Sequence, residues 1–242
     1  MRRNLRRLAA ALGLACGIAT AAPDSRDAGN ADQAVGMIVV NCEIMWRVSS
    51  TCIRHLPAHK RQVEYASLNW MEAHKSELDG AESKAGEAAL SKLAREAAPM
   101  IDATMREFER IAKVNGYDST CANALNGWIT GETVLAKESP RASKFLQDYL
   151  LEHPLSNDRR QYKADEAGCT KQGWNSGRAL DEATAFCACV TRTMHSRLSS
   201  EERAEFIERT KTKQSLTDWP PMQRITSDLV KCNSQAPSEV SR

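Results

Sequence analysis

The chain has 242 residues and a nearly even balance of charge, with 33 Lys and Arg against 31 Asp and Glu. Four of the arginines lie within the first seven residues, so the remainder of the chain is slightly acidic. This argues against the broad basic surface that binding to nucleic acid or to an anionic membrane requires. Much of the apolar content is alanine, which buries little area per residue, so the fold gains from covalent cross-links.

Residues 1–21 match a bacterial secretory signal peptide. Arginines precede the apolar run Leu8–Ile18, which is too short to span a bilayer, and Ala19-Thr20-Ala21 fits a small-x-small cleavage site. We therefore expect a periplasmic or secreted protein whose mature chain begins at Ala22. No later apolar run reaches the roughly 18 residues of a membrane helix, so we expect no integral membrane segment after signal removal.

Cys16 offers an alternative form of processing. The segment Gly13-Leu14-Ala15-Cys16 resembles a lipoprotein processing site, at which the cysteine is lipidated. Such sites usually carry a branched aliphatic residue three positions before the cysteine, where this chain has Gly13. Soluble secretion is the preferred expectation, and lipidation at Cys16 is the alternative.

The N-terminal half, after a polar and flexible segment at 22–31, is expected to be helical. Apolar residues that recur every three or four positions predict three long helices. Their seams run from Val35 to Leu56, from Val63 to Glu77 and from Leu90 to Ala112. Pro57 and Gly80 are expected to end the first two helices, and Pro99 is expected to kink the third.

Two shorter helices complete this predicted N-terminal domain, which spans residues 32–153. One contains Cys121, and the other begins at Ser139-Pro140, an N-cap followed by proline at the first helical position. Residues 154–168 have no helical period and are expected to form a linker.

Residues 169–232 are expected to form a cysteine-braced subdomain, followed by a flexible tail at 233–242. Three helices are predicted there, from Asp181 to about Leu198, from Ser199 to about Lys211 and from Pro220 to Cys232. Asp181 is the expected N-cap of the first, and Ser199 with Glu202 forms a capping box for the second. No alternating pattern predicts a strand. The sequence therefore predicts an all-α fold, a disulfide-braced helical bundle with a smaller C-terminal three-helix subdomain.

Cys187 and Cys189 lie one residue apart in a predicted helix. Because successive residues are ~100° apart, the two side chains point about 160° away from each other and cannot bond without unwinding the helix. A redox pair usually has two intervening residues, and a zinc site needs four converging ligands. We therefore expect structural disulfides, formed with Cys169 and Cys232.

The pairing of these four cysteines is predicted from the faces they occupy. Cys187 shares the apolar face of its helix, and Cys232 lies with Ile225 and Leu229 on the apolar side of the last helix. Cys189 points to the flank, where the loop that carries Cys169 is expected to reach it. The predicted pairs are Cys187–Cys232 and Cys169–Cys189.

The N-terminal half has three cysteines after the signal peptide, which is an odd number. Cys42 and Cys52 lie on one helix face but roughly 15 Å apart by helical rise, so they cannot bond to each other. One of them is expected to pair with Cys121. The sequence does not decide which; Cys52 is taken as the partner and Cys42 as the candidate free thiol.

Other candidates for chemistry are few. His55 and His59 have metal-ligand spacing, but Pro57 breaks the helix between them. Glu132, in a turn-prone stretch beside Trp128, is a candidate carboxylate for hydrolysis. No Gly-x-Ser-x-Gly segment or glycine-rich phosphate loop is present in the sequence. We predict no catalytic residue, no metal site and no cofactor.

Trp174 and Trp219 lie in predicted loops, where recognition residues concentrate, and are the candidate partner surface. We expect an exported, non-enzymatic helical protein that binds another protein of the cell envelope, as an adaptor, an inhibitor or an envelope-assembly factor. The alternatives are an envelope enzyme, either a thiol oxidoreductase using the odd cysteine or a hydrolase using Glu132, and a carrier of a lipid or small molecule.

Overall fold

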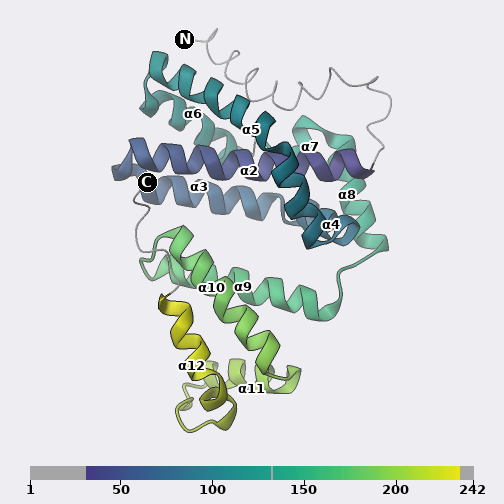
Figure 1. The fold of residues 1–242 in the computed structure, drawn as a ribbon, viewed down its shortest axis with the longest axis vertical. Helices are drawn as coiled ribbons and strands as arrows, with labels where there is room; N and C mark the ends of the chain where they lie inside the picture. Colours follow the sequence, from purple (N-terminus) through teal and green to yellow (C-terminus); the bar gives the residue numbers. More distant parts are fainter. Residues whose placement is uncertain (1–30, 132, 235–242) are drawn as a thin grey trace. The chain divides into compact units, whose positions relative to one another are not determined.

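The computed structural model describes residues 31–131 and 133–234, and within these ranges it has eleven α-helices, one 3-10 turn and no strand (Figure 1). The prediction of an all-α fold braced by disulfides is confirmed. The expected signal peptide at 1–21, the segment up to residue 30 and the chain beyond 234 lie outside the described residues. No helix in the described ranges has the length and apolar character needed to cross a bilayer.

The chain divides into two compact units, one that extends through Leu155 and one that begins at Ser156. The helices of the first unit are α2 (Ala31–His55), α3 (Lys60–Ala73), α4 (Lys75–Ala85), α5 (Glu87–Asn115), α6 (Tyr117–Thr130), α7 (Leu135–Glu138) and α8 (Pro140–Glu152), with the 3-10 turn η2 (Pro57–His59) between α2 and α3. Helix α2 is central and contacts α3, α4, α5, α6 and α8. Figure 1 shows α3 running back along α2 after the turn.

The core of the first unit follows the predicted apolar seams. Val35, Ile38, Met45 and Cys52 of α2 are all almost completely buried. The third seam buries Ile101, Met105, Phe108 and Ala112 on one side of α5. These helices are amphipathic, and their apolar sides meet around α2.

The helix breaks in this unit differ in part from the prediction. The turn at Pro57 lies where the sequence indicated, and α5 ends at Gly116, which has a φ of 87°. Gly80 does not interrupt a helix, because it lies inside α4, and the break falls at His74 instead. The short helix α7 was not predicted.

The second unit contains α9 (Asn157–Asn175), α10 (Leu180–Arg197), α11 (Ser200–Lys211) and α12 (Pro220–Ser234). The three predicted helices are present, but the linker predicted at 154–168 is wrong, because α9 occupies most of it. The Ser156 hydroxyl caps α9 by accepting a hydrogen bond from the Arg159 amide. Helix α10 begins at Leu180, so Asp181 lies in its first turn and is not its cap.

Three disulfides brace the helices. Cys52 of α2 bonds to Cys121 of α6, which leaves Cys42 as the free cysteine of the described residues. In the second unit the bonds are Cys169–Cys187 and Cys189–Cys232.

The predicted pairing in the second unit is therefore wrong. Helix α9 packs along α10 and brings Cys169 to the completely buried sulfur of Cys187, with their Cα atoms 5.6 Å apart. Helix α12 packs against α10 as well and brings Cys232 to Cys189. The prediction failed because it treated the chain before Cys169 as a loop at the flank of α10.

Candidate functional site

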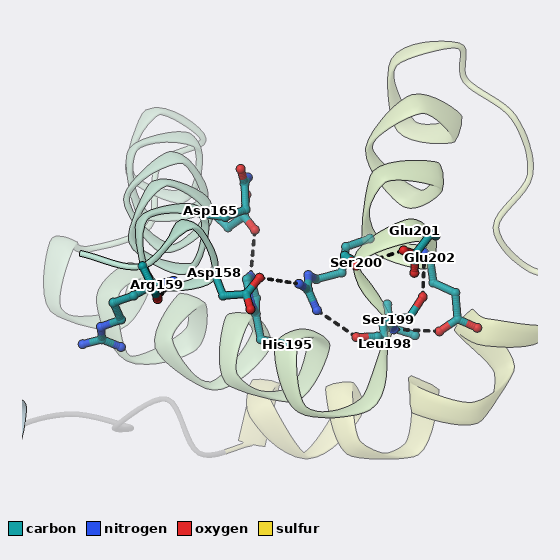
Figure 2. Close-up of polar contacts among 12 residues, drawn as sticks. Asp158, Arg159, Asp165, His195, Leu198, Ser199, Ser200, Glu201 and Glu202 are labelled. Carbon is teal, nitrogen blue, oxygen red and sulfur yellow. Dashed lines mark hydrogen bonds and ion pairs between the residues drawn. The ribbon is translucent and has the colours of Figure 1, made fainter. Parts of the chain in front are cut away.

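Ionisable side chains of the second unit gather where α9 meets α10 and α11. Asp165 of α9 points toward His195 of α10, and its carboxylate lies 2.9 Å from the imidazole Nε2 (Figure 2). Both side chains are mostly buried, at 12% exposure for His195 and 28% for Asp165. A mostly buried histidine with a carboxylate on one nitrogen is an arrangement that enzymes use for proton transfer.

A second pair lies beside the first. The Arg203 guanidinium of α11 donates a hydrogen bond to the Leu198 carbonyl at 2.8 Å, and it lies 3.9 Å from the Asp158 carboxylate of α9. The Arg203 side chain is only 13% exposed, whereas that of Asp158 is 89% exposed. Because the Asp158 carboxylate is exposed to water, its contact with Arg203 neutralises little of the arginine's charge. The contact serves mainly to position the Arg203 side chain.

Tyr162 of α9 completes the junction. Its ring meets the His195 ring edge-on, with centroids 5.1 Å apart, and the Arg159 guanidinium lies 5.0 Å from its centroid. Burial and the charge of Glu166 raise the pKa of Tyr162, while Arg192 opposes this shift. The phenol is therefore protonated at neutral pH and acts as a packing group.

The contacts of this junction join α9 to α10. A histidine that activates a nucleophile needs a hydroxyl or thiol within hydrogen-bond distance. Among the described residues, the His195 ring forms its hydrogen bond with Asp165, and it forms none with a hydroxyl or a thiol. The pair ties α9 to α10 a few residues from the Cys169–Cys187 bond.

The free thiol of Cys42 is unsuited to nucleophilic chemistry. Burial, with a contribution from Glu43, raises its pKa to about 11. The thiolate is the reactive form of cysteine, so at neutral pH the reactive fraction of Cys42 is very small. This weakens the thiol oxidoreductase alternative.

The other predicted candidates do not converge. His55 stacks on Tyr117 with ring centroids 3.6 Å apart, and His59 hydrogen-bonds to Gln62. Glu132 lies outside the described residues. No group of three or more His, Cys, Asp or Glu in the described ranges could hold a metal ion.

The two candidate tryptophans have different environments. Trp219 is 5% exposed and packs against Phe206 and the Arg209 guanidinium, so it lacks the accessible ring that a partner surface requires. Trp174, near the end of α9, is half-buried. Trp219 precedes α12 as predicted but is buried there, and Trp174 lies inside α9 instead of in the predicted loop.

The outward side of α9 was not predicted. Thr170 is the only fully buried residue among the described residues of this helix. Tyr162, Asp165 and Cys169 face inward, and the exposed side chains recur every three or four positions on the opposite side. We call these exposed residues the outer face of α9: Gln161, Ala164, Ala167, Gly168 and Lys171.

Comparison with known proteins identifies no relative of this chain. No protein-family model, no curated protein and no solved structure matches it. Any functional conclusion therefore depends on the residues described above.

Proposed function

We propose that the chain is an exported, non-enzymatic helical protein that binds another protein of the cell envelope through the outer face of α9. It acts as an adaptor, an inhibitor or an assembly factor. Export is supported by the pattern of residues 1–21 and by three disulfides, which form and persist mainly in oxidising compartments.

The observation that carries the proposal is the way in which α9 is held. Helices in proteins are stabilised mainly by burying an apolar face, yet this helix of 19 residues buries only Thr170 completely. The Cys169–Cys187 bond and the Asp165–His195 pair hold it against α10 instead. A rigid helix with an accessible side pre-organises a surface for binding and lowers the entropic cost of association.

The chemistry of the outer face indicates what it would bind. Ala164, Ala167 and Gly168 project little beyond the backbone, so a partner helix could approach closely. Arg160 and Lys171 are exposed at either end of this small-residue region and favour a partner with acidic groups. The ionisable groups behind the face pair with one another, which supports binding in preference to catalysis.

Affinity capture with a pair of charge variants tests this function. The mature protein, tagged at its C-terminus, is expected to enrich a specific envelope protein, and Ala167→Glu is expected to abolish that enrichment. Ala204→Glu places the same charge on an exposed position of α11 and is expected to retain it. Equal enrichment by all three proteins would contradict the role of α9, and circular dichroism checks that both variants fold.

A further inference from the structure

His74 occupies an unusual position in the first unit. It lies at the junction between α3 and α4 and is 1% exposed. Its Nδ1 lies 2.8 Å from the Trp70 carbonyl oxygen, and its Nε2 lies 3.0 Å from the backbone nitrogen of Leu135. A carbonyl only accepts and an amide N–H only donates, so the imidazole is neutral, with its proton on Nδ1.

The bond to Leu135 caps α7 from a distant part of the chain. Leu135 is the first residue of α7, and the N-cap residue Val134 provides no side-chain hydrogen bond. His74 therefore accepts from an N–H that the helix itself cannot satisfy. Leu135 is completely buried, so this amide has no access to water while the bond is intact.

Protonation of His74 is incompatible with this arrangement. A proton on Nε2 would make it a donor that faces the Leu135 amide, which is also a donor. Each would lose its partner in a buried setting, which is costly. Burial lowers the pKa of His74, and the Trp70 carbonyl and Glu77 oppose this shift only in part.

Two groups of Trp70 favour a cation, its carbonyl oxygen and its stacked ring, but neither replaces the bond that Nε2 would lose. Helix α3 contributes the Trp70 carbonyl and its ring, whose centroid is 3.9 Å from that of His74, and α7 contributes the Leu135 amide. The charged group that acts on His74 is Glu77 of α4.

The Glu77 carboxylate is already engaged by other donors. It accepts hydrogen bonds from Ser143 at 2.6 Å and Gln147 at 3.0 Å on α8, and from Ser76 at 2.9 Å. It is therefore not free to turn toward an imidazolium.

We propose that His74 is an acid-operated latch, whose protonation releases the N-terminus of α7 and opens the segment from Thr133 to Ser139. In an exported protein, the pH of the surroundings would then control the exposure of this segment. This inference does not depend on the proposed binding function of α9, which belongs to the other unit.

The test is hydrogen exchange of the full mature chain at pH 7.5 and 5.0, corrected for the intrinsic effect of pH. Because the opened state has a histidine pKa near its ordinary value, we expect the protection of residues 133–139 from exchange to fall about tenfold at pH 5.0. Peptides from α2 are expected to keep their protection. Equal loss in α2 would overturn a local latch, and so would unchanged protection of the segment.

Two variants assign the effect. The side chain in His74→Gln cannot titrate. The protection of the segment from exchange should therefore be the same at both pH values, even if it is lower than in the wild type. His59→Gln removes an exposed histidine and should respond to pH as the wild type does. A tenfold loss that persists in His74→Gln would overturn the proposal.

A measurement on the wild type keeps the proposal testable if His74→Gln does not fold. Nitrogen NMR of the imidazole should find the proton on Nδ1 at pH 7.5, and the Leu135 amide shift should follow the protonation of the same ring. A proton on Nε2 at pH 7.5 would overturn the latch.

Discussion

The backbones of α4 and α8 meet at Gly80 and Leu146. A β-carbon on Gly80 would lie 2.2 Å from the carbonyl oxygen of Leu146 and 2.8 Å from its carbonyl carbon. Only glycine fits there without displacing backbone. The close approach also places Ser143, one turn earlier on α8, within hydrogen-bond distance of Glu77 on α4.

Substitution of Gly80 by alanine is expected to destabilise the first unit by roughly 1–3 kcal/mol, because the helices must separate. Gly36 of α2 is a matched control, since nothing lies within 4 Å of a β-carbon built there. Gly36→Ala should stabilise the protein by about 0.5–1 kcal/mol through helix propensity. Urea unfolding of both variants measures the difference, and a neutral or stabilising Gly80→Ala would contradict the close contact.

The sequence predicted most helices correctly because their signals are local. Apolar spacing identified the long helices of the first unit, and the capping box of Ser199 and Glu202 is present with both hydrogen bonds. Gly80 was misjudged because a glycine inside a helix and a glycine that ends one look alike in sequence. The contact with Leu146 that requires it is 66 positions away along the chain.

Helix α9 was missed for a different physical reason. It buries only Thr170 completely, so its sequence carries almost no apolar period. Its stability comes from Ser156 at its N-terminus and from tertiary contacts such as the Cys169–Cys187 bond. Without α9, neither the disulfide pairing nor the Asp165–His195 pair could be predicted.

The disulfide pairing can be tested with one substitution. Cys187→Ser should leave a free thiol at Cys169, whereas the pairing predicted from sequence would leave it at Cys232. Alkylation under denaturing, non-reducing conditions followed by peptide mapping locates the label. Both this variant and the wild type also label Cys42, which is the internal reference. A label on Cys232 would contradict the observed bonds.

Loss of each disulfide in the second unit should have a cost that follows its loop length. The bonds Cys169–Cys187 and Cys189–Cys232 span 18 and 43 residues. In the chain-entropy model, replacing each pair by alanine costs about 3 and about 4 kcal/mol, respectively. Thermal unfolding of the two double variants measures this, with Cys42→Ala as a control that leaves every bond intact. An unchanged midpoint in both would refute the bracing role.

The capping box gives a smaller, local prediction. Ser199→Ala removes the hydroxyl that accepts from the Glu202 amide and should cost about 1 kcal/mol. Ser200 is its neighbour, and its hydroxyl contacts only the exposed carboxylate of Glu201, so Ser200→Ala should have little effect. Denaturant unfolding compares the two. Equal losses would show that the box does not stabilise α11.

Glu77 predicts an acid dependence separate from that of His74. Burial raises the pKa of Glu77, but hydrogen bonds from Ser143, Ser76 and Gln147 outweigh it, and the pKa lies below its ordinary 4.5. The Glu77 carboxylate therefore binds a proton more readily in the unfolded chain than in the folded one. This contribution to stability is complete above pH 4.5 and is lost as the pH falls through the lowered pKa.

The isosteric variant Glu77→Gln should lose less stability than the wild type when the pH is lowered below 4.5. Glu208→Gln, at an exposed position of α11, should behave as the wild type does. Urea unfolding at a series of pH values measures this. If Glu77→Gln and the wild type lose stability in parallel, the hydrogen bonds of α8 do not hold the carboxylate in its charged form.

Site-specific photocrosslinking along α9 is the most direct test of the proposed binding function. A photoreactive residue is introduced in living cells at one position at a time, from 161 to 168. The account predicts one discrete adduct whose yield peaks at the outer-face positions and falls at Lys163 and Glu166. The outer-face positions in this range are Gln161, Ala164, Ala167 and Gly168. No adduct, or an adduct of equal yield at every position, would contradict it.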